Sequence, residues 1–423
     1  MALFKKITLS NGLRVIFAPQ PNSLATTVLV LVEAGSKYEN KKINGLSHFL
    51  EHMCFKGTTK RPRAIDISSE LDALGAEYNA FTSQEWTGYF AKVQTNHGDL
   101  ALDIISDLYL NPIFDSKEIE KEKGVIIEEL NMYEDTPQRK VHDLFSTVLY
   151  GDQPAGWDIG GRKEIIKKLT RKDFIKYRDR HYVAQATTVV VAGAIDEKKI
   201  LPQIKKYFSN IQNGKKSGKI KTREKQNRPQ TLVKFKKSDQ THLMIGCRAF
   251  NAFDKRRFAL DVLSNILGGG MSSRLFQKIR EDLGAAYYIS SSTDLFTDHG
   301  YLAANAGVDH KKTEIVIKTI LEEFTRLATD KVGNTELRRA KDHLSGRLIL
   351  GLETSDALAL FYGGQEVMRQ QTLTPKELLN NIKAVSAEDI QSVAKFIFTN
   401  NKLNLSLIGP YKNDVNIKKI LHF

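Results

Sequence analysis

A lysine- and glycine-containing segment at residues 211–230 divides the chain into two parts of similar length. The segment, IQNGKKSGKIKTREKQNRPQ, has few apolar residues, a composition that is typical of an extended, solvated linker. Seven basic residues and one acidic residue give it a charge of 7 − 1 = +6, which we interpret as a flexible tether rather than an anion-binding site. A chain of 423 residues is also too long for one ordinary core. We therefore predict an N-terminal domain at 1–210, a basic linker at 211–230 and a C-terminal domain at 231–423.

The predicted elements follow a similar order in the two parts. In both parts, two strands are followed by a helix. In the first part the ranges are 3–34 around an Asn11-Gly12 turn, 45–55, 64–75, 76–94, 97–107, 116–132 and 188–193. In the second they are 231–250, 254–268, 286–308, 311–329, 334–350, 354–371 and 375–398. We interpret this order as a duplication: two similar α+β halves, each a mixed sheet covered by helices.

Composition excludes several classes of protein. A net charge of +14 is spread along the chain without a nucleic-acid-binding motif, so we expect no nucleic-acid partner. Two cysteines, Cys54 and Cys247, provide no disulfide framework. No apolar run is long enough to span a membrane, and the first residues resemble a strand rather than a secretory signal. We expect a cytoplasmic location in a prokaryote, or the mitochondrial matrix if a transit peptide has been removed.

The segment NGLSHFLEHM carries the strongest chemical signal in the sequence. It is predicted to be helical, with Asn44 at the N-cap position and Gly57 beyond the C-terminal end. His48 and His52 are four residues apart, so both imidazoles can reach one zinc ion from one helix face. Glu51 lies on the same face and can take a proton from a water molecule that the metal activates. The order H-x-x-E-H is the inverse of the commoner zincin motif.

A catalytic zinc needs a third protein ligand, which we expect on the acid-rich helix at 118–135. Glu122 and Glu129 are seven residues apart and share one helix face. Glu129 is the predicted ligand, and Glu122 is predicted to orient a ligand or the water. Helix geometry alone does not distinguish Glu129 from its neighbour Glu128.

Three segments, GLSHFLEHMCFKGT, LGAEYNAFTSQEWTGYF and EKEKGVIIEELNMYEDTP, together resemble the pitrilysin-type inverzincin peptidases. The branch they resemble most holds the β subunit of the mitochondrial processing peptidase and its small bacterial homologues. The resemblance implies a clamshell of two α+β halves. The second half has no H-x-x-E-H of its own, so we expect one zinc per chain. The resemblance also implies His48, His52 and Glu129 as ligands, which favours Glu129 over Glu128, and it implies Glu51 as general base with Glu122 nearby.

The same resemblance implies how substrate is bound. Asn79, Ala80 and Phe81 match an edge strand to which a peptide adds through backbone hydrogen bonds. In the second half, Arg280 and Tyr287 match a pair that would stabilise the oxyanion of the tetrahedral intermediate.

The sequence therefore predicts a zinc-dependent endopeptidase for short or unfolded peptides. Because the zinc motif and the Arg280–Tyr287 pair lie on one chain, we expect a self-sufficient homodimer, with a heterodimer as the alternative. The rival hypothesis is a non-catalytic partner subunit of a processing-peptidase-like assembly. Loss of the zinc motif marks such subunits, and the motif is intact here.

Overall fold

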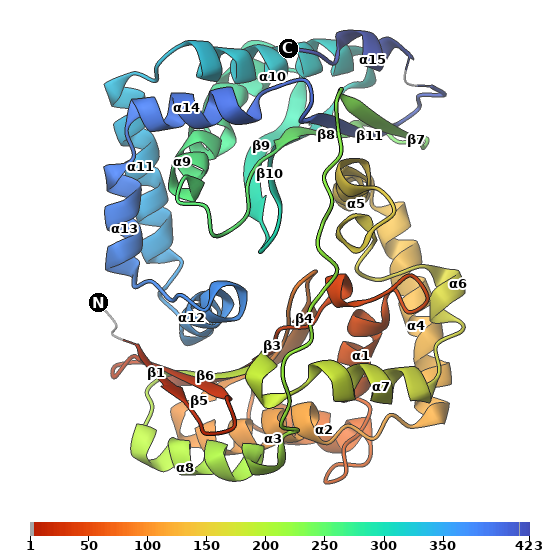
Figure 1. The fold of residues 1–423 in the computed structure, drawn as a ribbon, viewed down its shortest axis with the longest axis vertical. Coiled ribbons are helices and arrows are strands. Elements are labelled where there is room, and N and C mark those ends of the chain that lie inside the picture. Colours follow the sequence, from red (N-terminus) through yellow and green to blue (C-terminus); the bar gives the residue numbers. More distant parts are fainter. Residues whose placement is uncertain (1–3, 414) are drawn as a thin grey trace. The chain divides into compact units, whose positions relative to one another are not determined.

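The strand-forming residues of the N-terminal part build one six-stranded sheet in a computed structural model, which describes residues 4–413 and 415–423 (Figure 1). The strand order is β1 (Lys5–Thr8), β2 (Arg14–Pro19), β6 (Thr187–Gly193), β3 (Ala25–Val32), β5 (Thr87–Gln94) and β4 (Glu77–Thr82). β2 and β6 are parallel, and the other pairs are antiparallel. The predicted hairpin at Asn11-Gly12 joins β1 to β2, and residue 3 of the predicted strand region lies outside the described residues.

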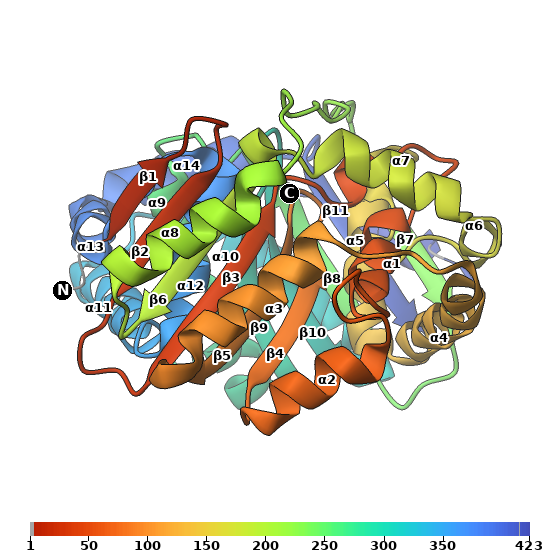
Figure 2. The ribbon, with the colours of Figure 1, turned by 90° about the horizontal axis from the view of Figure 1, so that it is seen from below.

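Helices cover both faces of this sheet. Val28 and Val30 of β3 pack into a core with α3 (Gly98–Leu110) and α8 (Glu197–Tyr207), while Leu29 and Leu31 pack against α12 (Ser355–Arg369). Figures 1 and 2 show α12 on one side of the strands, with α3 and α8 on the other. A strand buried on both faces has no polar face, which explains the continuous apolar run of β3. The unit also contains α1 (Leu46–Cys54), α2 (Ala64–Ala73), α6 (Lys163–Ile166), α7 (Arg171–His181) and the first part of α4 (Ser116–Asp135).

The C-terminal part forms a five-stranded sheet that is built in the same way. Its order is β7 (Gln230–Phe235), β11 (Leu403–Gly409), β8 (Thr241–Arg248), β10 (Gly300–Val308) and β9 (Ala286–Leu295). These strands repeat the chain order and directions of β2, β6, β3, β5 and β4. The predicted duplication and the α+β class are therefore confirmed. The α-helices that lie with this sheet are α5 (Pro137–Tyr150), which comes from the N-terminal part of the chain, and α9 (Arg257–Gly268), α10 (Thr313–Thr329), α11 (Asn334–Leu350), α13 (Pro375–Ala384), α14 (Ala387–Ile397) and α15 (Val415–Ile420).

Two compact units result, and each takes one segment from the other part of the chain. Unit 1 comprises the residues up to Leu130, Asp158–Ile220 and Ile349–Pro375, and unit 2 comprises the rest. α12 thus covers the sheet of unit 1, and α5 covers the sheet of unit 2. Unit 1 therefore lacks residues 131–157 of the predicted stretch 1–210, and unit 2 lacks residues 349–375 of the predicted stretch 231–423. The exchanged helices could not be assigned from the sequence, because any apolar helix face can cover any apolar sheet face.

The linker requires a correction. Residues 211–229 contain no helix or strand and most of them are exposed, but two of the lysines hold the segment to unit 1. Lys216 Nζ lies 2.8 Å from Glu33 Oε2, and Lys219 Nζ lies 2.6 Å from Glu85 Oε1. Both carboxylates are buried, so the two lysines neutralise charges that the fold has removed from water.

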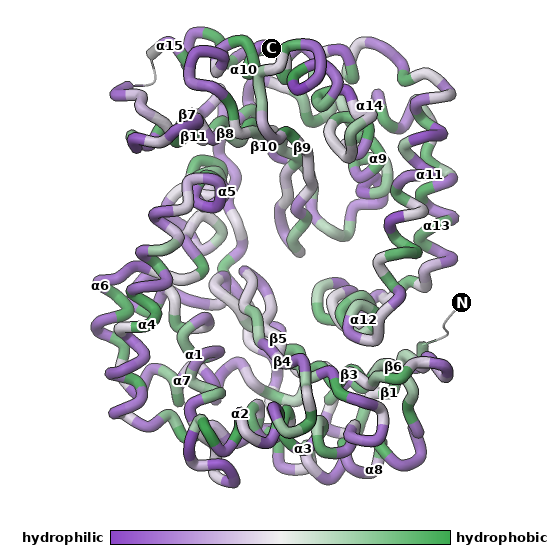
Figure 3. The backbone as a smooth tube through the Cα atoms, turned by 180° about the vertical axis from the view of Figure 1, so that it is seen from behind, coloured by the Kyte–Doolittle hydropathy of each residue, from purple (hydrophilic) through white to green (hydrophobic). Residues whose placement is uncertain are grey.

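The last predicted helix, 375–398, is two helices. α13 ends at Ala384, and α14 begins after Ser386, whose hydroxyl accepts a hydrogen bond from the amide of Asp389. The Asp389 carboxylate accepts from the Ser386 amide in return, so a capping box interrupts the apolar periodicity. Elsewhere, Figure 3 shows hydrophobic residues that recur within the helices, with hydrophilic residues between them, as expected for helices with one buried face.

Candidate metal centre

Helix α1 presents the H-x-x-E-H motif from a firmly packed position. Phe49, Leu50 and Met53 are buried in the core of unit 1 and fix the inner face of the helix. His48, Glu51 and His52 are less buried than these residues. The helical spacing therefore places the side chains of the three motif residues on one face of the helix, as the sequence predicted.

The N-terminal end of α1 differs from the prediction. The N-cap is Gly45, at φ +96°, and Asn44 instead donates its side-chain amide to Glu39 Oε2 and to the Asp158 carbonyl. A side chain at Gly45 would collide with the Gly160 carbonyl, 2.6 Å from an added Cβ. The amides of Gly45 and Ser47 are bound by Glu39, which therefore takes the capping role expected of Asn44.

Three ligand atoms converge at the motif. His48 Nε2 and His52 Nε2 are 3.3 Å apart, and Glu129 Oε2 lies 3.6 Å from the first and 3.5 Å from the second. Zinc holds such ligands at about 2.0–2.1 Å in a tetrahedron, which places neighbouring ligand atoms about 3.4 Å apart. The three atoms therefore fit one face of a zinc tetrahedron. They form the one cluster of this kind among the described residues.

The structure distinguishes Glu129 from Glu128, which helix geometry alone could not do. α4 presents Glu129 toward both histidines, whereas Glu128 is exposed. Adjacent residues on a helix point about 100° apart, so only one of them can face α1.

Glu122 holds His52 in place. Its Oε1 lies 3.0 Å from His52 Nδ1, and its Oε2 lies 2.6 Å from Lys56 Nζ. Burial raises the pKa of Glu122, but His52 and Lys56 outweigh it and leave the pKa below its ordinary value. An ionised Glu122 accepts a hydrogen bond from the protonated Nδ1, which leaves Nε2 of His52 available to a metal. Sequence reasoning missed Lys56, although it lies one helical turn beyond His52.

Glu51 is held by a residue of the neighbouring strand. The Thr82 hydroxyl of β4 donates to Glu51 Oε2 at 2.5 Å. Burial raises the pKa of Glu51, and the hydrogen bond from Thr82 and the two histidines offset only part of that rise. A raised pKa makes this carboxylate a stronger base than an exposed glutamate. Thr82 was also missed, because nothing in the sequence pairs it with residue 51.

The predicted substrate strand, β4, is an edge strand of its sheet. The Ala80 amide donates to Asn79 Oδ1 at 2.8 Å. The Phe81 ring packs edge-to-face against Trp86, with 5.2 Å between ring centroids. Asn79 and Ala80 therefore lie on an edge strand, where the Asn79 side chain binds the Ala80 amide, and Phe81 has a packing role.

Arg280 and Tyr287 lie in unit 2. The guanidinium of Arg280 is 6.0 Å from the centroid of the Tyr287 ring, and Tyr287 is 73% exposed. The two side chains are therefore neighbours, and the phenol is accessible.

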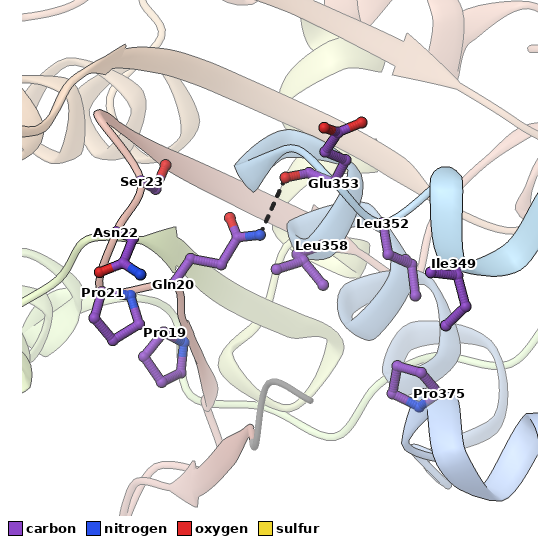
Figure 4. A pocket seen from close by; sticks show the side chains of 10 residues that line it. All are labelled: Pro19, Gln20, Pro21, Asn22, Ser23, Ile349, Leu352, Glu353, Leu358 and Pro375. Atoms are coloured by element: carbon purple, nitrogen blue, oxygen red, sulfur yellow. Dashed lines mark hydrogen bonds between the residues drawn. The ribbon is translucent and has the colours of Figure 1, made fainter.

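A separate pocket of unit 1 contains none of the predicted site residues. It lies between the β2–β3 turn and the segment around α12, where Gln20 donates to the Glu353 carbonyl at 3.1 Å (Figure 4). Its other lining residues are Pro19, Pro21, Asn22, Ser23, Ile349, Leu352, Leu358 and Pro375.

The protonation of His52 predicts a pH-dependent stability of the metal-free protein. Burial lowers the pKa of His52, but hydrogen bonds to Glu122 and Glu129 outweigh it and raise the pKa from 6.5 to about 9. The hydrogen bonds of protonated His52 therefore stabilise the folded state. This contribution to the free energy of unfolding is complete below pH 6.5 and is lost as the pH rises through about 9. We compare the free energy of unfolding of the wild type with that of His52→Asn at two pH values. The advantage of the wild type should be about 2–3 kcal/mol larger at pH 6 than at pH 9.5. Urea titrations with a chelator present measure this difference, and equal differences at both pH values would contradict the assignment.

The protein is a two-unit α+β protein, in which each unit has a mixed sheet with the same strand connectivity. Helices α1 and α4 of unit 1 bring His48, His52 and Glu129 together as a candidate metal centre. Residues 14–162 match the family model described as Insulinase (Peptidase family M16), and residues 168–344 match the Peptidase M16 inactive domain. The chain is 34% identical over 412 residues to the uncharacterized zinc protease YmxG of Bacillus subtilis, covering 97% of this chain and 99% of that protein. An uncharacterized zinc protease of Rickettsia felis is 34% identical over 95% of this chain and 96% of its own length. The chain belongs to peptidase family M16.

Solved structures agree with the fold. A protease from Helicobacter pylori has a TM-score of 0.90 at 24% identity, covering 97% of this chain and 100% of that chain. A peptidase M16 inactive domain from Pseudomonas fluorescens has a TM-score of 0.88 at 16% identity, covering 96% and 98%. No helix among the described residues is long and apolar enough to cross a membrane.

Proposed function

We propose that this chain is a zinc-dependent endopeptidase that hydrolyses short or unfolded peptides. The observation that carries the proposal is the convergence of His48 Nε2, His52 Nε2 and Glu129 Oε2 at distances that suit zinc, with Glu51 beside them. Relatives that match the chain over nearly its whole length are named zinc proteases, which supports the choice of metal and of reaction. We assign one zinc ion to each chain, because the described residues provide one such cluster.

When bound, zinc supplies a Lewis acid that lowers the pKa of a water molecule and polarises the scissile carbonyl. Glu51 takes a proton from the attacking water and passes it to the nitrogen of the peptide bond as that bond breaks. The Thr82 hydroxyl, which donates to Oε2 of Glu51, holds this carboxylate in position. Glu122 keeps Nδ1 of His52 protonated, so that Nε2 faces the metal.

The remaining roles follow the family resemblance. We assign peptide binding to β4 at Asn79 and Ala80, where an extended substrate adds to the edge of the sheet. Phe81 supports this strand through its contact with Trp86. Arg280 and Tyr287 are assigned to the oxyanion. A homodimer and a cytoplasmic location belong to the same proposal, the latter supported by bacterial relatives.

Peptide cleavage with and without a chelator tests the function. The purified chain is incubated with a mixture of unfolded peptides, and the products are mapped by mass spectrometry while zinc content is measured. We expect internal cleavage, about one zinc per chain, loss of cleavage with chelator and recovery when zinc is returned. Cleavage that persists without metal would contradict the proposal. A zinc-loaded chain that cleaves nothing would favour the non-catalytic partner subunit.

A further inference from the structure

Glu39 is a buried carboxylate that the proposed chemistry does not use. It lies in the loop before α1 and is 1% exposed. Its Oε2 accepts hydrogen bonds from the Gly45 amide at 2.8 Å and from Asn44 Nδ2 at 3.1 Å, and its Oε1 accepts from the Ser47 amide at 2.6 Å. One carboxylate therefore binds two amides at the start of the helix that carries the metal ligands.

Helix α1 has no cap of its own. A helix leaves its first amides without partners, and a side chain at the N-cap position usually binds one of them. Gly45 has no side chain, and its positive φ and the nearby Gly160 carbonyl exclude a larger residue. A negative charge at this end also interacts favourably with the helix dipole. Glu39 thus provides the anchor that the local sequence cannot.

Glu39 binds the residue that precedes His48, and His48 has fewer hydrogen bonds to hold its ring than His52 has. His52 is oriented through Nδ1 by Glu122, whereas the buried Nδ1 of His48 has no hydrogen-bond partner among the described residues. The position of His48 Nε2 therefore depends on where the backbone places residue 48. That residue directly follows Ser47, whose amide Glu39 binds and whose hydroxyl contacts the Tyr177 hydroxyl at 2.7 Å.

We propose that Glu39 is a positioning residue of the metal centre: its carboxylate fixes the first turn of α1 and thereby places His48 opposite His52 and Glu129. The inference rests on the proposed function, because it concerns affinity for zinc. Burial raises the pKa of Glu39 to about 7, and the hydrogen bonds from Ser47, Gly45 and Asn44 offset part of that rise.

Zinc affinity of Glu39→Gln tests the proposal in the full-length chain. The amide keeps the size of the side chain, but its NH2 group cannot accept from a backbone amide and its charge is gone. Competition with a chromophoric chelator should show zinc binding weakened about 10–100-fold, the range found when groups that orient ligands are removed. Glu39→Asp keeps the charge with a shorter reach and should give an intermediate loss, so it serves if Glu39→Gln does not fold.

Glu33→Gln is the matched control. Glu33 is a second buried carboxylate of unit 1, and it pairs with Arg14 and Lys216 rather than with α1. We expect it to change thermal stability while its zinc affinity stays within about two-fold of wild type. Wild-type affinity in the folded Glu39 variants, or an equal loss in Glu33→Gln, would overturn the proposal. A wild-type chain that fails to bind zinc would overturn the proposed function and this inference with it.

Discussion

Glu51→Gln is expected to lower kcat for peptide cleavage by about 10³-fold, since general-base catalysis contributes about 10²–10⁴-fold. Glutamine keeps the volume of the side chain and can still accept a hydrogen bond from Thr82, but it cannot take a proton from water. Zinc content should stay at the wild-type level, because Glu51 is not among the three converging ligand atoms. Steady-state kinetics on one cleaved peptide, with zinc measured on the same sample, provide the test.

This variant separates a catalytic role from a structural one. A loss of activity that is accompanied by loss of zinc would mean that Glu51 supports the metal rather than the proton transfer. Full activity with zinc bound would contradict the assignment of Glu51 as general base, and with it the proposed reaction.

Glu129→Gln is expected to remove most of the zinc affinity, together with the activity. The substitution replaces a charged oxygen, which lies 3.5–3.6 Å from both histidine nitrogens, by a neutral amide. Removing a group that only orients a ligand weakens metal binding by about 10–100-fold. We expect a larger loss of zinc affinity here, because one of the three proposed protein ligands is removed. Zinc titration and peptide cleavage at equal protein concentration measure both effects.

Glu128→Gln is the control for this experiment, since it changes the same charge one residue away on an exposed part of α4. It should keep zinc affinity and activity near wild type, because surface substitutions usually change stability by less than about 0.5 kcal/mol. A larger loss in Glu128→Gln than in Glu129→Gln would reverse the assignment of the third ligand.

The helical spacing of the motif explains how much of the site could be predicted. His48, Glu51 and His52 share one short helix, so their mutual positions follow from the geometry of a single turn. The roles of Glu39 and Thr82 depend on a loop and a strand that reach α1 only in the folded chain. Asn44 was assigned as the cap because it has the right residue type at the right place, but its side chain instead binds Glu39 and the Asp158 carbonyl.

The sequence by itself predicted many of the elements and the repeated order of strands and helices, because alternation and helical periodicity are properties of short windows. It also determined that His48 and His52 share one helix, one turn apart. Only the tertiary structure decided that α12 covers the first sheet and α5 the second, and that Glu129 rather than Glu128 faces the histidines. It also decided that Lys216 and Lys219 pair with buried carboxylates. These features depend on the path of the chain through space, since apolar faces and charged groups find partners by proximity rather than by sequence separation.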